Sequence, residues 1–509
     1  MRIGWLVLAG LPVMACATAA GPSATPVPPS TVAGQFYPAD PARLRAAIDG
    51  YLRDAIPPRS VDPVAIVVPH AGVVFSGQIA ADGYRQLVGR RFDTVVILGA
   101  NHTGRLDQRM AVFDGPSVST PLGTTGVDRE LAAAIVNAGV GAVFDSSAHE
   151  GEHSVAVQIP FVQSVLPHAK IVAIVVGSSD PVACVRFGRA LAKLLTGRRA
   201  VLVASSDLSH YPAQRDAVPV DARTLEAVAS LDPDTLGMTL VRSDEARPAN
   251  LATSACGEGA IRVVMEAARS LGASRGTVVS YANSGDTISG EPGRVVGYGA
   301  VVFSRGERGS DVEALTHAAT DTTSALDAAD ERVLLRLARE TIVRYLASGT
   351  VPFPRGGSSK LLREAGVFVT LKKHGEMRGC VGRAQAQGTL VRLVSAMAFE
   401  SAFRDGRFGP VRAAELGEID IEVSVLTPPR QVEGPADIVV GRDGVILRVG
   451  DRSAVFLPQV AAEQGWNREQ MLDNLAQKAG LSARAWRDKT AQLLTFRADV
   501  FSEATVGIR

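Results

Sequence analysis

Side chains that bind transition metals and transfer protons gather in five short polar clusters of the sequence. The clusters are PHAG at 69–72, GANHTG at 99–104, EGEHS at 150–154, SSDLSHY at 205–211 and SACG at 254–257. Together they supply imidazole, thiol and carboxylate groups. The clusters are far apart in the sequence, so their spacing alone leaves open which residues are ligands. The sequence therefore predicts a metal or acid–base site without fixing its members.

Short runs rich in valine and isoleucine come directly before three of these clusters and indicate strands. The predicted strands cover 64–68, 94–98, 171–176, 201–204, 277–280 and 295–303, and predicted helices cover 41–53, 78–87, 128–137, 181–195 and 256–271. Apolar strands that alternate with amphipathic helices are typical of an α/β sheet covered on both faces. Because ligand sites in such sheets lie at the carboxyl ends of the strands, we expect His70, His102, Asp207 and His210 to meet in one crevice.

The composition of the whole chain limits the classes of protein to consider. Its 509 residues suggest two to four domains at roughly 100–200 residues each, and 46% hydrophobic residues can form sizeable cores. A net charge of +1 argues against a protein that binds nucleic acid through a large basic surface. The four cysteines are too few for a disulfide scaffold.

A different pattern begins after a polar, small-residue-rich linker predicted at 304–328. The predicted helices are 331–348, 457–464, 468–479 and 483–489, and the predicted strands are 367–371, 419–426, 438–440 and 445–449. This pattern indicates a second domain of the α+β type at 329–505. Its most distinctive stretch is EMRGCVG at 376–382, where two glycines predict a tight turn. Cys380 in that turn is either a buried structural thiol or a nucleophilic or redox-active one.

The N-terminus looks like an export address. Residues 1–19 have the apolar core of a signal peptide, and Val13-Met14-Ala15-Cys16 resembles a lipobox, which would place a lipid on Cys16. Cleavage after Ala17-Thr18-Ala19 and an uncleaved anchor are the alternatives. Residues 20–30 form a Pro/Ser-rich spacer. We expect an exported protein, a periplasmic or outer-envelope lipoprotein of a bacterium, that meets the membrane only through its N-terminal lipid or signal.

Six motifs in the first half resemble the Memo family, whose prokaryotic members are called AmmeMemoRadiSam system protein B. The motifs are VAGQFYP at 32–38, VPHAGVVFSG at 68–77, LGANHTG at 98–104, EGEHSVAVQIPF at 150–161, SSDLSHY at 205–211 and ACGEGAI at 255–261. The resemblance covers 31–303. It implies a LigB-like fold, similar to that of the class III extradiol dioxygenases, which use non-haem iron.

The same resemblance implies a mononuclear iron or copper site with His70, His102 and Cys256 as ligands. It places His153, Asp207 and His210 in the same pocket, as acid–base groups or as hydrogen-bond partners of the ligands. Extradiol enzymes use a carboxylate where this chain has Cys256. Because Cys256 opens a predicted helix, we expect the helix N-terminus to favour its thiolate. The alternative for Cys256 is a buried structural thiol.

The second half resembles the AMMECR family, AmmeMemoRadiSam system protein A, over 329–505. The shared motifs are MRGCVG at 377–382, DGRFGP at 405–410 and EVSVL at 422–426. They give a candidate site made of Arg378, Cys380, Asp405, Arg407 and Glu422, with Cys380 as the candidate catalytic residue. The two families are commonly encoded beside a radical-SAM protein, so a pathway partner of that class is expected.

Two functions of different kinds fit these observations. The first is a metal-dependent oxidoreductase, dioxygenase-like in its chemistry, that acts on an unknown small-molecule or protein substrate. The second is a non-catalytic metal-binding or scaffold protein of the cell envelope. Nucleic-acid binding by the second domain is disfavoured by the near-zero net charge and by an aromatic content of only 5%.

Overall fold

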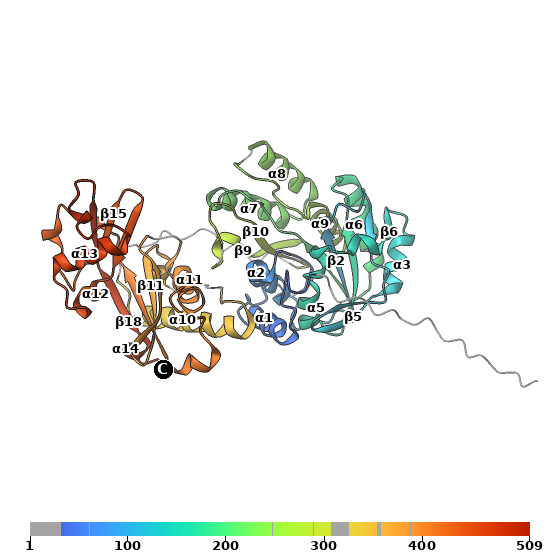
Figure 1. Ribbon diagram of the computed structural model, residues 1–509. Helices are drawn as coiled ribbons and strands as arrows, with labels where there is room; N and C mark the ends of the chain where they lie inside the picture. Colours follow the sequence, from blue (N-terminus) through green and yellow to red (C-terminus); the bar gives the residue numbers. More distant parts are fainter. Residues whose placement is uncertain are drawn as a thin grey trace, which may run out of the picture.

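The computed structural model describes residues 32–508 apart from 61, 247, 289, 307–324, 354–357 and 386–387. It shows an N-terminal domain that ends at β10 (Gly297–Ser304) and a C-terminal domain that begins at α10 (Ala328–Ser348) (Figure 1). The predicted signal peptide, the lipidation at Cys16, the spacer and most of the predicted linker lie outside the described residues. Among the helices that are described, none is long and apolar enough to cross a membrane.

The N-terminal domain is built on a mixed sheet of eight strands. Their order is β6 (Ala142–Phe144), β3 (Met110–Val112), β7 (Lys170–Val176), β2 (Thr94–Ala100), β8 (Ala200–Ser205), β1 (Pro63–Val68), β10 and β9 (Arg275–Asn283). The four central strands, β7, β2, β8 and β1, run parallel, while β10, β9 and β3 pair antiparallel at the two sides. The α/β architecture predicted from the sequence is thus confirmed, with a mixed sheet.

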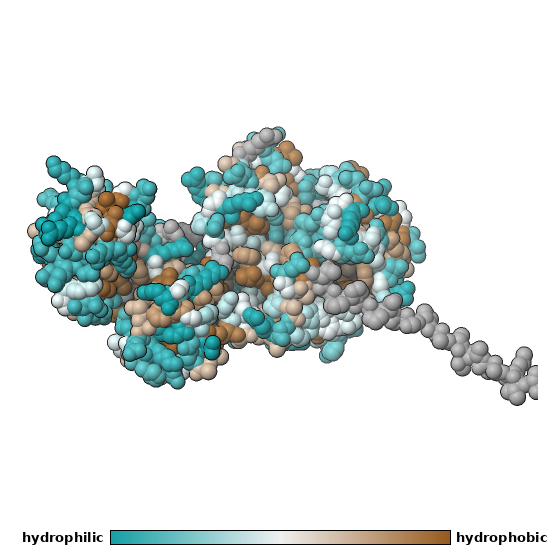
Figure 2. Space-filling view, in the orientation of Figure 1, coloured by the Kyte–Doolittle hydropathy of each residue, from teal (hydrophilic) through white to brown (hydrophobic). Residues whose placement is uncertain are grey.

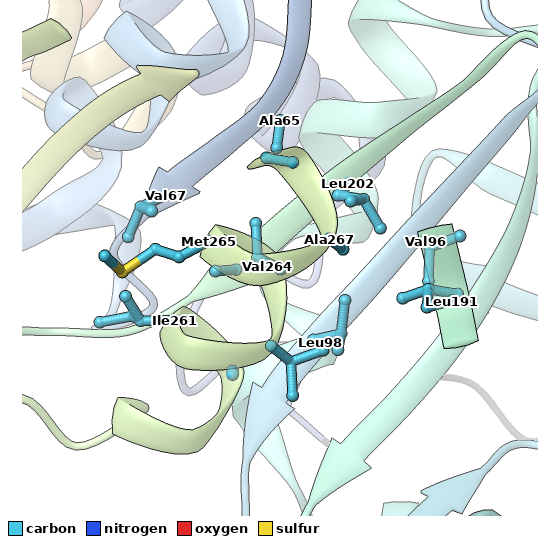
Figure 3. Close-up of a cluster of buried hydrophobic side chains, with 14 of the residues drawn as sticks. Ala65, Val67, Val96, Leu98, Leu191, Leu202, Ile261, Val264, Met265 and Ala267 are labelled. Atoms are coloured by element: carbon cyan, nitrogen blue, oxygen red, sulfur yellow. The ribbon is translucent and has the colours of Figure 1, made fainter. Parts of the chain in front are cut away.

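Helices cover both faces of this sheet. On one face, Val96, Leu98 and Leu202 pack against α6 (Pro181–Leu195) and α9 (Glu258–Ser270) (Figure 3). The elements of the other face are α1 (Pro41–Arg53), α2 (Val73–Arg85) and α5 (Ile159–Val165). The remaining elements of the domain are α3 (Arg129–Asn137), α4 (His153–Ala156), α7 (Gln214–Ala229), α8 (Pro233–Ala246) and a hairpin of β4 (Ser117–Thr120) and β5 (Gly123–Gly126). Burial on both faces explains why the central strands are apolar throughout rather than alternating.

The C-terminal domain contains two four-stranded sheets. The first has the order β12 (Glu376–Arg383), β11 (Gly366–Lys373), β13 (Ile419–Leu426) and β18 (Ala498–Ser502), and packs on α10 and α11 (Leu390–Phe403). The second has the order β14 (Arg430–Gln431), β17 (Gln492–Phe496), β15 (Gly444–Val449) and β16 (Arg452–Phe456). Its core includes α12 (Pro458–Glu463) and α13 (Arg468–Lys478).

Three predictions for this domain are wrong. Residues 438–440 are not a strand, and 483–489 contain only a short 3-10 helix, Ala485–Arg487. The MRGCVG stretch is not a turn, because it forms strand β12. The turn lies just before it, where His374 and Gly375 have positive φ angles. Gly379 serves close packing instead, since a Cβ there would lie 2.3 Å from the carbonyl oxygen of Ser401.

The two domains contact each other through α1 and α10. Arg344 on α10 forms an ion pair with Asp54, which follows α1, and Arg392 on α11 forms one with Asp286. Figure 2 shows hydrophobic side chains near the middle of the molecule, where the domains meet, on a surface that is otherwise largely hydrophilic. Among the described residues, the interface therefore includes these two ion pairs and the packing of Phe353 against the N-terminal core.

Candidate metal centre

Three imidazole rings meet at the carboxyl end of the parallel strands. His70 follows β1, His102 follows β2, and His153 begins α4. One ligand nitrogen from each ring lies within 4.8 Å of the other two. The ring centroids of His70 and His102 are 5.0 Å apart, and those of His102 and His153 are 4.4 Å apart. These three residues, the histidine trio, could hold a metal ion.

Hydrogen bonds place the proton of His70 on Nδ1. This atom lies 3.0 Å from Ser205 Oγ. Ser205 donates its single hydroxyl proton to the carbonyl oxygen of Ser154 at 2.6 Å, so His70 Nδ1 has to be the donor to Ser205. Nε2 of His70 therefore keeps a lone pair. Burial, and then repulsion from His102, lowers the pKa of His70 to about 3, which keeps the ring in the neutral form that binds metals.

Glu152 orients His102. Its buried carboxylate accepts hydrogen bonds from the backbone N of His102 at 2.7 Å and from His102 Nδ1 at 2.9 Å. Burial raises the pKa of Glu152, but the hydrogen bonds from His102 and from the Ser154 backbone outweigh it and lower the pKa to about 2. His102 therefore also carries its proton on Nδ1 and leaves Nε2 free. A carboxylate that orients a histidine in this way is the usual support of a metal ligand.

His153 is held by stacking rather than by a hydrogen bond to its ring. The ring of Phe36 lies 4.3 Å from it, with 19° between the ring planes. Its Nδ1 is 3.7 Å from Glu152 Oε1, which is too long for a hydrogen bond. Burial, and then the charges of His70 and His102, lower the pKa of His153 to about 4. The sequence placed His153 among the acid–base groups, and the structure brings it into the trio.

Cys256 lies beside the trio, with Sγ 3.2 Å from His70 Nε2. Helix α9 begins at Glu258, two residues later than predicted, and its N-cap is Gly257. Burial, and then the charge of Asp207, raise the pKa of the Cys256 thiol. Burial therefore opposes the thiolate that the helix N-terminus is expected to favour. A nearby cation would be needed to remove the thiol proton.

Asp207 and His210 lie in the loop after β8. The buried carboxylate of Asp207 accepts hydrogen bonds from the backbone N–H groups of His70 at 2.7 Å and Ala71 at 3.2 Å. Burial raises the pKa of Asp207. His210 Nδ1 lies 2.9 Å from the carbonyl oxygen of Leu208. Asp207 thus fixes the loop that carries His70, while His210 keeps its Nε2 free.

The letters HEGEH at 149–153 have the spacing of the HExxH zinc motif, but the structure breaks that motif. HExxH requires one helix that places both histidines on the same face. Here a 3-10 helix ends at His149 and α4 begins at His153, with Gly151 at a φ of +75° between them. His149 points elsewhere, with Nε2 3.1 Å from the carbonyl oxygen of Ala111.

Sequence reasoning did not single out Glu152 and Ser205, although both define the geometry of the trio. Glu152 stands next to His153 in the EGEHS segment, and Ser205 opens the SSDLSHY segment. Ser205 also accepts a hydrogen bond from Gln158 Nε2 at 2.7 Å. A polar residue that is expected to be buried beside a predicted ligand is the signal that could have identified them.

The candidate residues of the C-terminal domain form a second cluster around Cys380 on β12. The Cys380 backbone N–H donates to Asp405 Oδ2 at 2.8 Å, and its carbonyl oxygen accepts from Arg407 at 2.7 Å. Arg407 also binds both carboxylate oxygens of Asp405. This ion pair, with the bond from the Cys380 backbone, lowers the pKa of Asp405 to about 2. Thr370 Oγ1 lies 3.3 Å from Cys380 Sγ.

Two further ion pairs complete this cluster. Arg378 binds both oxygens of Glu415, at 2.9 and 3.1 Å. Glu422 accepts from Lys372 at 2.8 Å, and it shares a cross-strand row with Thr370 and Cys380. The structure thus brings Cys380, Asp405 and Arg407 into direct contact, while Arg378 and Glu422 are paired with other residues.

The structure shows a mixed α/β domain with three histidines that could hold a metal ion, joined to a second domain of sheets and helices. Residues 29–302, more than half of the chain, match the family described as Memo-like protein, and residues 335–501 match the one described as AMMECR1. The chain therefore belongs to the Memo-like family and also carries an AMMECR1 domain.

Two named relatives agree with the assignment of the N-terminal domain. A MEMO1 family protein of Desulfurococcus amylolyticus is 36% identical over 285 residues, which cover 53% of this chain and 97% of the relative. The MEMO1 family protein MK0963 of Methanopyrus kandleri is 36% identical over 287 residues, which cover 54% of this chain and 98% of that protein. The crystal structure of the uncharacterized protein PH0010 from Pyrococcus horikoshii is 38% identical, with a TM-score of 0.33, and the match covers 34% of this chain and 92% of that one.

Proposed function

We propose that the N-terminal domain holds a single iron or copper ion and uses it for redox chemistry on a small-molecule or protein substrate. The observation that carries this proposal is the arrangement of protons around the site. His70 and His102 both donate their Nδ1 protons to fixed acceptors, so both Nε2 atoms keep a lone pair that a metal ion could take, that of His70 by displacing the thiol proton of Cys256 at 3.2 Å. Imidazole nitrogens with a thiol beside them suit iron and copper better than magnesium or calcium.

We assign His70, His102 and Cys256 as the ligands. Cys256 Sγ already lies 3.2 Å from the free nitrogen of His70, close enough for both atoms to bind one ion. Two imidazoles and one thiolate leave positions open for water or substrate. A bound ion would supply the redox chemistry and would also stabilise the Cys256 thiolate.

His153 and His210 are the proposed proton-transfer groups. The Nδ1 atom of His153 is outside hydrogen-bonding distance of Glu152, so its proton is not committed to that carboxylate. His210 has Nδ1 committed to a backbone carbonyl and Nε2 free. Asp207 positions the loop of His70 through two backbone hydrogen bonds.

Metal analysis of the full chain after anaerobic purification tests this proposal. We expect stoichiometric iron or copper in the wild type, a marked loss in Cys256→Ser, and no change in His168→Ala, which alters an exposed histidine. Retention of metal in Cys256→Ser, with loss in His153→Ala, would replace Cys256 by His153 as the third ligand. Substoichiometric metal that His70→Ala leaves unchanged would refute the metal centre.

Redox activity is tested separately on the metal-loaded protein. We expect the bound ion to be reduced by dithionite and reoxidised by air, as followed by its absorption or electron paramagnetic resonance spectrum. A bound ion that does neither would favour the second candidate function, a non-catalytic metal-binding or scaffold protein.

We also propose that the protein is an envelope lipoprotein and that it works with a radical-SAM partner. The lipobox-like residues before Cys16 and the pairing of the two families support this pair of proposals. Mass spectrometry of the N-terminal peptide, in wild type and in Cys16→Ser, tests the lipid. Co-purification with a radical-SAM protein encoded nearby tests the partner.

A further inference from the structure

We propose that Cys380 is a site of thiol–disulfide exchange that favours small disulfides carrying carboxylate groups. Cys380 is a free, partly exposed cysteine on β12, the edge strand of the first C-terminal sheet. Cys184, by contrast, is buried in the N-terminal core. The site shares no residue with the histidine trio, so the proposal is independent of the metal centre.

The surroundings of the Cys380 sulfur suit a reaction that needs no protein base. Sγ accepts a hydrogen bond from the Thr370 hydroxyl at 3.3 Å. His374, the nearest histidine in the sequence, lies 3.5 Å from Glu418 instead. In disulfide exchange, the Cys380 sulfur forms a bond to one sulfur of the small disulfide, the S–S bond of that reagent breaks, and the leaving sulfur takes up the proton that Cys380 releases. The products are a mixed disulfide on the protein and one small thiol.

Lys478, the last residue of α13, supplies the positive charge that would select the reagent. Its Nζ donates to the carbonyl oxygen of Val455 at 3.0 Å and lies 4.8 Å from the centroid of the Phe456 ring, so the ammonium group has a defined position. Burial lowers the pKa of Lys478, Cys380 raises it, and Arg407 lowers it. The three groups therefore interact electrostatically, and no carboxylate of the described residues contributes to the shift.

Arg407 adds further N–H donors beside the same thiol. Its Nε and Nη2 bind the two oxygens of Asp405, and Nη2 also donates to the carbonyl oxygen of Cys380. Nη1 faces the sulfur of Met377 at 3.9 Å, which is a weak acceptor. The charges of Arg407 and Asp405 cancel, so these two residues and Lys478 sum to one positive charge. An anionic reagent is therefore favoured beside Cys380.

Three disulfides of similar size and different charge test this preference. They are 3,3′-dithiodipropionate, which is anionic, 2-hydroxyethyl disulfide, which is neutral, and cystamine, which is cationic. Peptide mapping by mass spectrometry follows the mixed disulfide at Cys380 in the full chain, separately from the other cysteines. Each rate is divided by the rate at Cys380 in the chain unfolded by urea, which removes the intrinsic reactivity of the reagent.

The normalised rates at Cys380 are expected to follow the charge of the reagent. We expect them to fall from the anionic to the neutral to the cationic disulfide, by about two- to fivefold at each step, which is the effect of one exposed charge pair. The differences are expected to shrink at high salt, because salt screens exposed charges. Equal normalised rates for the three reagents, or no mixed disulfide at Cys380 in the folded chain, would overturn the proposal.

Two lysine variants locate the charge that sets the preference. Lys478→Gln removes the ammonium group beside Cys380, and Lys489→Gln is the matched control, an exposed lysine in the same half of the domain. We expect Lys478→Gln to bring the three normalised rates close together and Lys489→Gln to leave their order unchanged. Circular dichroism and thermal unfolding confirm that both variants are folded. An unchanged preference in folded Lys478→Gln would contradict the role of Lys478 and with it the proposed selectivity.

Discussion

The clusters around Cys256 and Cys380 differ in whether their polar groups still have lone pairs available to a cation. Around Cys256, His70 and His102 each keep an Nε2 lone pair, while Glu152 holds the His102 ring and Asp207 holds the backbone N–H of His70. Around Cys380, Arg407 is bound to Asp405 and Arg378 is bound to Glu415. The first cluster has lone pairs to offer to a cation, whereas the second has already neutralised its own charges. Only the first therefore has the chemistry of a metal site.

The largest effect is expected from removal of a ligand. His70→Ala deletes the most deeply buried member of the trio, which is 1% exposed, together with the free nitrogen beside Cys256. We expect the metal content of the full chain to fall to background. Metal analysis of His70→Ala beside His374→Ala, an exposed histidine of the C-terminal domain, measures the difference. An equal loss of metal in both variants would show that the metal is not bound specifically by the histidine trio.

A smaller effect is expected when the ligand remains but loses its support. Glu152→Gln keeps the shape of the side chain but removes the charge that accepts the His102 proton. We expect metal affinity to fall about 10–100-fold, as for other carboxylates that orient a metal-bound histidine.

Competition with a chelator measures that affinity. Glu150→Gln is the matched control, because Glu150 is exposed and pairs only with the surface residue Arg105 among the described ion pairs. If the two variants bind metal equally well, Glu152 does not support the site.

A substitution in the cluster around Cys380 should lower the stability of the protein and leave its metal content unchanged. Asp405→Ala removes the acceptor of the Cys380 backbone N–H and the carboxylate partner of Arg407, which keeps only its bond to the Cys380 carbonyl oxygen among the described backbone acceptors. We expect a loss of about 1–3 kcal/mol in the free energy of unfolding and unchanged metal content. Denaturant unfolding and metal analysis of the same preparation check both. A parallel loss of metal would show that the clusters are coupled.

Changes of pH are expected to act on stability with opposite signs in the two domains. Burial raises the pKa of Asp221 in the N-terminal domain to about 7, although Ser209 and Tyr281 donate hydrogen bonds to it. The folded protein then keeps a proton that the unfolded chain releases above about pH 4, so this group lowers stability as pH rises from about 4 to about 7. The pKa of Asp405 is lowered to about 2, so its stabilisation is present above about pH 4 and is lost as pH falls toward 2.

Unfolding measured across this pH range separates the two carboxylates. Asp221→Asn is expected to flatten the decline between pH 4 and 7, and Asp405→Asn to flatten the loss below pH 4. A variant that shifts the whole curve without changing its slope in the stated range would contradict the corresponding assignment.

The sequence predicted the N-terminal domain better than the C-terminal one, for physical reasons. Helices at 41–53 and 181–195 were predicted at their observed bounds, because Asp40 and Asp180 cap them just before a proline. The prediction of a strand at 438–440 was wrong because three consecutive apolar residues match a strand pattern, but no neighbouring strand pairs with them in the described structure. The turn at MRGCVG was wrong because glycine also serves close packing, which only the position of α11 reveals.

The candidate site was predictable in its members but not in its connections. The tendency of ligand sites to lie at strand ends was sufficient to select His70, His102, Asp207 and His210 from the sequence. That tendency could not reveal that Glu152 turns toward His102, because the bond joins residues 50 positions apart. Nor could it reveal that Cys256 is buried beside Asp207, which raises the pKa of its thiol.

The hydrogen bond from His70 to Ser205 also determines how protons can travel through the site. His70 Nδ1 donates a hydrogen bond to Ser205, and Ser205 donates its own proton to the carbonyl oxygen of Ser154. A carbonyl oxygen has no proton to donate further, so the chain of hydrogen bonds stops there. The hydrogen bonds on the Nδ1 side of His70 therefore provide no route for a proton between the pocket and solvent. A proton that a reaction at this site consumes or releases would therefore have to use another route.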